Sequence, residues 1–226
     1  MTFSIAARCP KTGMFGLAVA SSSLAVAARC SHVRAGAGAI ASQNITDPRL
    51  GISGLDLLAA GRSAAETLAR LERQAGAAIA FRQLTIVDAR GRTAALSGAK
   101  TLGTHAIAHG DGAVAAGNML KHDGVPAAMI RLYDASSTLP FAGRLIGAMQ
   151  AGLDAGGEAG PIHSIGLKIA VEVPWPVADL RVDWHDTDPL GELKKLWAIY
   201  APQLDDYVTR ALDPLRAPSF GVPGEK

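Results

Sequence analysis

The sequence is poor in aromatic residues and in cysteine. Phe, Trp and Tyr make up only 5% of the chain, whereas alanine is abundant and glycine occurs 25 times. Layers of secondary structure with such small side chains are expected to pack closely. The two cysteines, Cys9 and Cys30, match no spacing typical of metal or redox sites. We therefore expect reduced thiols, no metal and no cofactor.

Charge of one sign and long apolar runs are also lacking. The 22 basic and 20 acidic residues give a net charge of +2, which offers no reason to expect a nucleic-acid or membrane-surface partner. The most apolar stretch, 17–28, contains three serines and falls short of the ~20 apolar residues of a membrane span. The first residues lack the basic-then-apolar order of a secretion signal. These absences predict a cytoplasmic protein without nucleic-acid or membrane partners.

What the chain does contain is a regular pattern of secondary-structure signals. Hydrophobic residues reach 49%, enough for the core of a single domain over 1–226. Apolar alternation and turn residues predict strands at 2–8, 15–20, 32–35, 37–43, 84–87, 93–96, 105–108, 113–116, 165–171 and 179–182. A first helix is predicted at 50–60, and a second begins at a capping box formed by Ser63 and Glu66. Further helices are predicted at about 123–135, with Asp123 as the cap, and at about 139–155. The last one is predicted at about 188–213, with an interruption at Pro202. A proline-containing tail over 215–226 is expected to be flexible.

The order of these elements favours one fold class. Four strands, two helices, four strands, two helices, two strands and a terminal helix do not fit a repeated βαβ pattern. They fit an α+β fold in which two stacked, mostly antiparallel sheets have a helical layer outside each, a four-layer αββα sandwich.

Several motifs resemble those of the domain-of-unknown-function family 1028. They are Thr2-Phe-Ser-Ile, Gly16-Leu-Ala-Val-Ala-Ser21, Arg34-Ala-Gly-Ala-Gly-Ala-Ile-Ala-Ser-Gln43, Asp47-Pro-Arg-Leu-Gly51, Gly117-Asn-Met119, Asp179-Leu-Arg-Val-Asp183 and Glu192-Leu-Lys-Lys-Leu196. The resemblance implies membership of the N-terminal nucleophile (Ntn) hydrolase-like superfamily, which shares the αββα sandwich. It implies no substrate, since the function of the family is unknown.

Within such a superfamily, Thr2 is the candidate nucleophile. The hydroxyl of an N-terminal threonine attacks an acyl carbon while its own α-amine accepts the proton. An α-amine titrates near pH ~7.7–8, which suits a general base at neutral pH. The mechanism requires removal of Met1, because the nitrogen of Thr2 is otherwise an amide. The leading hypothesis is an amidohydrolase that cleaves a C–N bond in a small metabolite.

Further site residues are placed only by analogy with this superfamily. Ser21, at the end of the second strand, is expected to contact the α-amine, and Arg34 is expected to supply the cation that lowers the pKa of the nucleophile. Asn118 is a further catalytic candidate. The residues predicted to bind the substrate or oxyanion are His32, Gln43, Asn44, His163 and Ser164. Each of these residues also fits an ordinary turn or cap.

Two other hypotheses remain open on the sequence alone. One is a cyclic-amide or purine-ring hydrolase on the same fold that uses Arg34, His32 and Asn118 rather than the N-terminus. The other is a non-enzymatic protein that binds a small molecule or acts as a scaffold. A homodimer, through a sheet edge or the last helix, is compatible with all three hypotheses.

Overall fold

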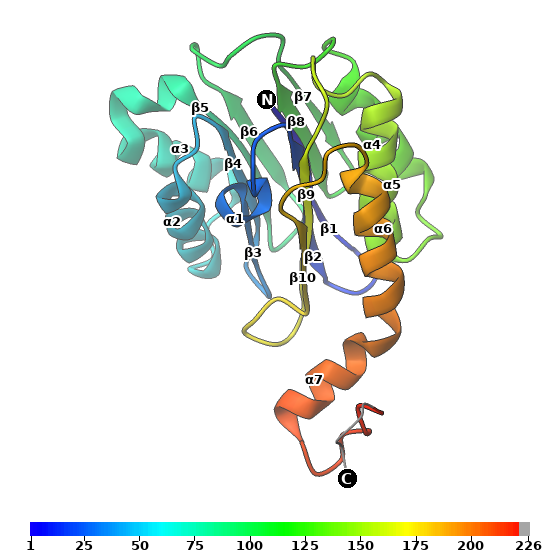
Figure 1. The fold of residues 1–226 in the computed structure, drawn as a ribbon. Coiled ribbons are helices and arrows are strands. Elements are labelled where there is room, and N and C mark those ends of the chain that lie inside the picture. Colours follow the sequence, from blue (N-terminus) through cyan, green and yellow to red (C-terminus); the bar gives the residue numbers. More distant parts are fainter. Residues whose placement is uncertain (222–226) are drawn as a thin grey trace.

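The computed structural model describes residues 1–221 and consists of two antiparallel sheets packed face to face (Figure 1). The six-stranded sheet has the order β10-β9-β2-β1-β8-β7 and the four-stranded sheet the order β3-β4-β5-β6. The strands are β1 (Thr2–Arg8), β2 (Phe15–Ser21), β3 (Ser31–Arg34), β4 (Gly38–Asn44), β5 (Arg82–Asp88), β6 (Thr93–Ser97), β7 (Ala106–Gly110), β8 (Ala113–Asn118), β9 (Ser164–Ala170) and β10 (Ala178–Val182).

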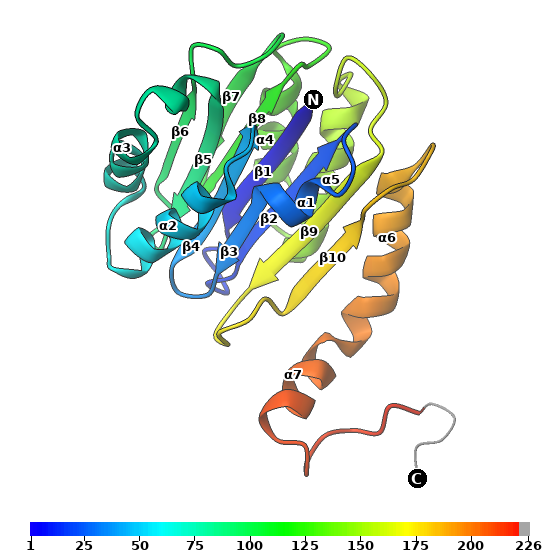
Figure 2. The same ribbon diagram turned by 60° about the vertical axis from the view of Figure 1, so that its left-hand side comes forward.

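Helices cover the outer face of each sheet (Figures 1 and 2). Outside the four-stranded sheet lie α2 (Pro48–Ala59) and α3 (Ala64–Ala75), followed by the 3-10 helix η1 (Gly76–Phe81). Outside the six-stranded sheet lie α4 (Val125–Ala135), α5 (Phe141–Asp154) and α6 (Pro189–Tyr200). The predicted α+β, four-layer αββα sandwich is therefore confirmed.

The helix starts follow local capping chemistry. Ser63 and Glu66 form the predicted capping box at α3, and Asp188 accepts a hydrogen bond from the Gly191 amide at α6. The prediction of Asp123 as the cap of α4 is wrong: Gly124 is the N-cap residue and no side chain caps this helix. Pro126 in its first turn still favours the start there.

Residue alternation along the strands sets which side chains lie between the sheets. On β1, Phe3 and Ile5 pack toward α4 and α5, whereas Ala6 packs against the other sheet. Thr2 and Ser4 share the side of Ala6 and therefore point between the sheets. Buried polar side chains gather in this layer at the end where β1 begins: Thr2, Ser4, Ser21, Gln43, Gln83, Asn118 and Ser164. The middle of the layer is mostly apolar.

The last part of the chain leaves the sandwich. After α6, the 3-10 helix η2 (Ala201–Gln203) leads into α7 (Leu204–Leu212), which projects away from the sheets (Figure 2). Of the tail predicted to be flexible over 215–226, residues 222–226 lie outside the described residues. Within residues 1–221, no helix has the length and apolar character needed to cross a membrane.

Candidate functional site

Thr2 lies at the end of a central strand, between two neighbouring strands. β1 pairs with β2 on one side and with β8 on the other, and Thr2 is directly opposite Asn118. The Thr2 hydroxyl donates a hydrogen bond to the Met1 carbonyl oxygen and lies 3.5 Å from the Ser21 hydroxyl oxygen. Figure 2 shows β1 in the middle of its sheet with the N-terminus at one end of the sandwich. Strands on both sides of β1 in the six-stranded sheet therefore hold this threonine.

A cavity of about 390 Å³ opens in front of Thr2. It is lined by Met1, Thr2, Ser23, Val26, Arg29, Cys30, Asn44, Ile45, Thr46 and Pro48. Much of this wall comes from the short helix α1 (Val26–Cys30) and from the end of β4. Such a volume suits a small metabolite rather than a polymer.

Arg29 is the single charged side chain among the residues that line this cavity. Its guanidinium donates to the carbonyl oxygens of Leu24 and Ala25, and its Nη2 donates to the Ser23 hydroxyl at 3.1 Å. Ser23 in turn lies 2.8 Å from the Ser21 hydroxyl. A chain of polar contacts thus joins the cation to the surroundings of Thr2.

Ser21 and Ser164 hold the segment between β2 and α1. The Ser21 hydroxyl donates to the Met1 carbonyl and accepts from the Ser23 amide at 3.0 Å. The Ser164 hydroxyl donates to the Ser23 carbonyl at 2.6 Å and accepts from the Val26 amide at 3.1 Å. Both serines are fully buried. Ser21 therefore lies against the Met1–Thr2 peptide, while Ser164 positions the loop behind it.

A buried network of amide side chains lies beneath Thr2 and joins the two sheets. Ser4 donates to Gln43 at 2.8 Å, and Gln43 donates to Gln83 at 2.7 Å. Asn118 donates to the same Gln83 oxygen at 3.0 Å. Gln83 also donates to the Ser97 hydroxyl and the Gly117 carbonyl, both at 2.9 Å. This satisfied network fixes the distance between the sheets at the site.

The network changes the roles assigned to two residues. Gln43 is fully buried, Asn118 is 1% exposed, and neither lines the cavity. Their amides bind Gln83, so the structure places both residues in the network between the sheets rather than at the cavity wall.

Asn44 is a cavity residue with an unusual backbone. Its φ of 71° is left-handed, its Nδ2 donates to the Phe81 carbonyl at 2.6 Å, and its Oδ1 accepts from the Leu102 amide at 3.2 Å. Ala25, which comes directly before α1, has a φ value of 52°, and Met119, which follows Asn118, has a φ value of 50°. Left-handed backbone at residues other than glycine concentrates at functional sites. Three such residues surround this end of the sandwich.

Glu158 is a buried carboxyl group near the N-terminus. The side chain is 4% exposed, its Oε2 accepts from the Ser22 amide at 3.0 Å, and its Oε1 has no hydrogen-bond partner. Burial raises the pKa of Glu158 to about 7, against the opposing effects of the N-terminal ammonium and the Ser22 amide. A carboxyl group with such a pKa exchanges protons near neutral pH.

Cys30 lines the cavity, yet its thiol is poorly suited to act as a nucleophile. It is 2% exposed and lies 3.3 Å from the Thr46 hydroxyl. Burial raises the pKa of the Cys30 thiol, which disfavours the reactive thiolate. Of the two side chains, Thr2 is therefore the stronger candidate for a nucleophile.

Arg34 and His32 are not next to Thr2, contrary to prediction. Arg34 pairs with Gly38 at the far end of β4, six residues or about 20 Å from Asn44, and forms an ion pair with Asp56 at 2.9 Å. His32 packs against Gly51 of α2, where burial lowers the pKa of its imidazole. Both side chains face α2 because Val33, between them, packs into the layer between the sheets.

His163 also lies outside the cavity. Its imidazole Nδ1 is 3.0 Å from the His185 carbonyl, and its ring stacks on Trp184 with the centroids 4.4 Å apart. Its backbone amide donates to the Ser21 carbonyl at 2.8 Å. His163 thus supports the loop through its backbone. Among the described residues, no group of three His, Cys, Asp or Glu side chains is arranged to hold a metal ion.

The family model for a family of unknown function matches residues 2–193. The chain belongs to the DUF1028 family. Among solved structures, protein SPO2555 from Silicibacter pomeroyi, also assigned to DUF1028, is 29% identical with a TM-score of 0.81, covering 88% of this chain and 89% of that one. The match ends within α6, so η2 and α7 lie beyond the DUF1028 match.

A more distant similarity is to Anbu (ancestral beta-subunit) from Yersinia bercovieri, at 14% identity and a TM-score of 0.40 over 91% of this chain and 97% of that one. A similarity this low says nothing about the chemistry of the DUF1028 chain. A comparison with curated proteins gave no match. The resemblance to DUF1028 predicted from motifs is confirmed, while the Ntn hydrolase-like superfamily stays a prediction.

Proposed function

We propose that this DUF1028 protein hydrolyses a C–N bond in a small amide, with Thr2 as the nucleophile once Met1 is removed. The observation that carries the proposal is the position of the Thr2 hydroxyl, at the wall of a cavity of about 390 Å³ and among polar side chains from both sheets. The hydroxyl already lies beside a carbonyl group, that of Met1. Removal of Met1 takes this carbonyl group away and leaves room beside the hydroxyl for the carbonyl group of an amide substrate.

The reaction follows from groups at this site. The Thr2 oxygen attacks the amide carbon, and its proton passes to the α-amine and then to the departing nitrogen as the C–N bond breaks. Water then hydrolyses the Thr2 ester and releases the acid. Arg29 favours the oxyanion that forms in both steps, since it is the one charged side chain lining the cavity.

Acylation of the pure protein tests this proposal without knowledge of the substrate. We expect p-nitrophenyl acetate to transfer one acetyl group to Thr2 of the Met1-free protein, with the adduct located by peptide mass spectrometry. Thr2→Ala should abolish this adduct. Thr46→Ala is the matched control, because Thr46 lines the same cavity and its hydroxyl contacts Cys30 rather than Thr2. An adduct that persists in Thr2→Ala, with the fold intact, would overturn the proposal.

The two other hypotheses have less support. The purine-ring or cyclic-amide alternative needs Arg34, His32 and Asn118 in one pocket, but His32 and Arg34 face α2, whereas Asn118 lies in the network between the sheets. A binding or scaffold protein predicts thermal stabilisation by a ligand without any product. A homodimer stays a prediction, and solution size measurement tests it.

A further inference from the structure

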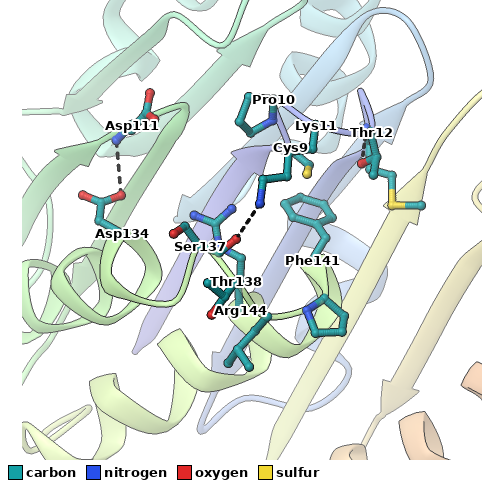
Figure 3. Close-up of a pocket in the computed structure, with 13 residues that line it drawn as sticks. Cys9, Pro10, Lys11, Thr12, Asp111, Asp134, Ser137, Thr138, Phe141 and Arg144 are labelled. Carbon is teal, nitrogen blue, oxygen red and sulfur yellow. Dashed lines mark hydrogen bonds between the residues drawn. The ribbon is translucent and has the colours of Figure 1, made fainter.

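A second cavity, of about 480 Å³, lies at the opposite end of β1 from Thr2 (Figure 3). It lies between the turn after β1, the β7–β8 turn and the facing ends of α4 and α5. Its wall includes Cys9, Lys11, Met14, Leu139, Phe141 and Arg144. No step of the proposed hydrolysis uses these residues.

Arg144 is a buried cation without a counter-ion at this cavity. The residue is 7% exposed, and no carboxylate of the described chain lies within 4.0 Å of its guanidinium. Nε and Nη2 donate to the Tyr133 carbonyl at 3.2 and 2.9 Å, and the guanidinium lies 3.8 Å from the centroid of the Tyr133 ring. Nη1 donates to none of the described residues. Because an uncompensated buried charge is costly, the arrangement favours an anion in the cavity.

The remaining charges divide the cavity into two sides. Lys11, in the turn after β1, donates a hydrogen bond to the Ser137 carbonyl at 3.3 Å. This bond lies on the same side of the cavity as Arg144 (Figure 3). On the other side, the Asp134 carboxylate accepts from the Asp111 amide at 3.3 Å (Figure 3). The cationic side therefore attracts one anionic group, while the two aspartates disfavour a second negative charge.

We infer that this cavity binds a small monocarboxylate with an apolar body. The carboxylate accepts from Nη1 of Arg144 and from the Lys11 ammonium, since guanidinium and ammonium donors form strong hydrogen bonds to carboxylates. The apolar body packs on Met14, Leu139 and Phe141.

Cys9 supplies a reporter inside the cavity. Burial acts to raise the pKa of the Cys9 thiol, but hydrogen bonds from Thr12 and Lys11 and the positive charge of Arg144 bring the pKa below its ordinary value. A lowered pKa favours the thiolate, the form that is alkylated, and Cys9, which is 6% exposed, lines this cavity. A carboxylate bound at Arg144 should cover the thiol and slow its alkylation.

Phenylacetate and its neutral isostere phenylacetamide test the inference by calorimetry and thermal denaturation. Phenylacetate should bind, raise the Tm and slow alkylation of Cys9 by iodoacetamide, whereas phenylacetamide should do none of these. Lys11→Ala should weaken phenylacetate binding about tenfold, because it removes one charge-assisted hydrogen bond. Lys100→Ala, which removes an ammonium elsewhere on the molecule, should leave the affinity unchanged.

Several results would overturn the inference. They are equal binding of the acid and the amide, binding of phenylacetate that Lys11→Ala leaves unchanged, or no binding of phenylacetate at millimolar concentration. Lys11 is the variant of choice because its side chain is exposed and its hydrogen bond to the Ser137 carbonyl lies at the surface. Inorganic phosphate, which is mainly a dianion at pH ~8, should bind more weakly than phenylacetate, and stronger binding would contradict the role of the two aspartates.

Discussion

Replacing Glu158 by Gln should remove a pH dependence of stability that the buried carboxyl group causes. In the folded protein the pKa of Glu158 is raised from 4.5 to about 7 by burial. Between these values the folded state holds a proton that the unfolded state has released, so stability falls as pH rises through this window. At ~1.4 kcal/mol per pH unit, the loss amounts to about 3 kcal/mol and is complete above pH ~7.

Glu158→Gln has no such proton to lose. Its amide keeps an oxygen for the Ser22 amide and places an NH₂ group where Oε1 now has no partner. The variant should match the wild type near pH ~4.5 and exceed it by about 3 kcal/mol at pH ~8. For a chain of 226 residues this corresponds to a Tm difference of roughly 6–12 °C.

Thermal denaturation between pH ~4.5 and ~8.5, followed by circular dichroism, measures this difference. Glu72→Gln is the matched control, because Glu72 lies on α3 and forms no ion pair with any described residue. Its Tm should follow the wild-type curve. Parallel curves for Glu158→Gln and the wild type would refute the account of a buried carboxyl group with a raised pKa.

Three further predictions concern the network, the backbone and the cavity. Gln83→Leu should lower stability by roughly 3 kcal/mol in chemical denaturation, because it leaves several buried groups without partners; an unchanged midpoint would contradict this. Gly38→Ala should destabilise by at least ~2 kcal/mol, since its Cβ would lie 2.2 Å from the Val87 carbonyl oxygen. Its control Gly143→Ala, with open space around the Cβ on α5, should instead stabilise by about 0.5–1 kcal/mol. Arg29→Ala should slow acetylation of Thr2 by p-nitrophenyl acetate roughly tenfold or more, while Arg29→Lys retains part of the rate; equal rates would exclude Arg29 from the reaction.

Most regular elements could be predicted from the sequence because their signals are local. Alternation in Phe3, Ile5 and Ala7 marks β1, and the Ser63–Glu66 capping box marks the start of α3. The pairing of strands is not local. β1 lies beside β8, more than 100 residues later, and no short pattern encodes that contact. The layer arrangement could be predicted because the order of the elements restricts it strongly.

The error at Arg34 follows from one missed helix. α1 has five residues, too few for an apolar period, and its N-cap Ala25 has φ 52° with no side-chain cap. Without α1, the sequence does not place Arg29 at the cavity, and Arg34 becomes the candidate cation only because it lies on the predicted third strand. The alternation of side chains along β3 also excludes Arg34 from the site. Val33 points into the layer between the sheets, so its neighbours on the strand must point away from that layer.

Gln83 and Glu158 could not be found from sequence. Gln83 reads as an ordinary start of a strand, and Glu158 lies in a glycine-rich loop with no motif. The contacts of both residues join segments that are distant in the sequence. Gln83 binds Gln43 and Asn118, and Glu158 accepts from the Ser22 amide. By contrast, the position of Thr2 at the start of a strand was visible from the sequence, and its neighbour Ser21 followed from the hairpin.

The intact mass of the native, untagged protein tests the central claim most directly. Catalysis by Thr2 requires a free α-amine on Thr2, and therefore a mature chain that lacks Met1. The account predicts a mass lower than that of the full sequence by one methionine residue, with Thr2 first in N-terminal sequencing. A mass that includes Met1 in the native protein would contradict it, because the nitrogen of Thr2 would then be an amide and could not accept the proton.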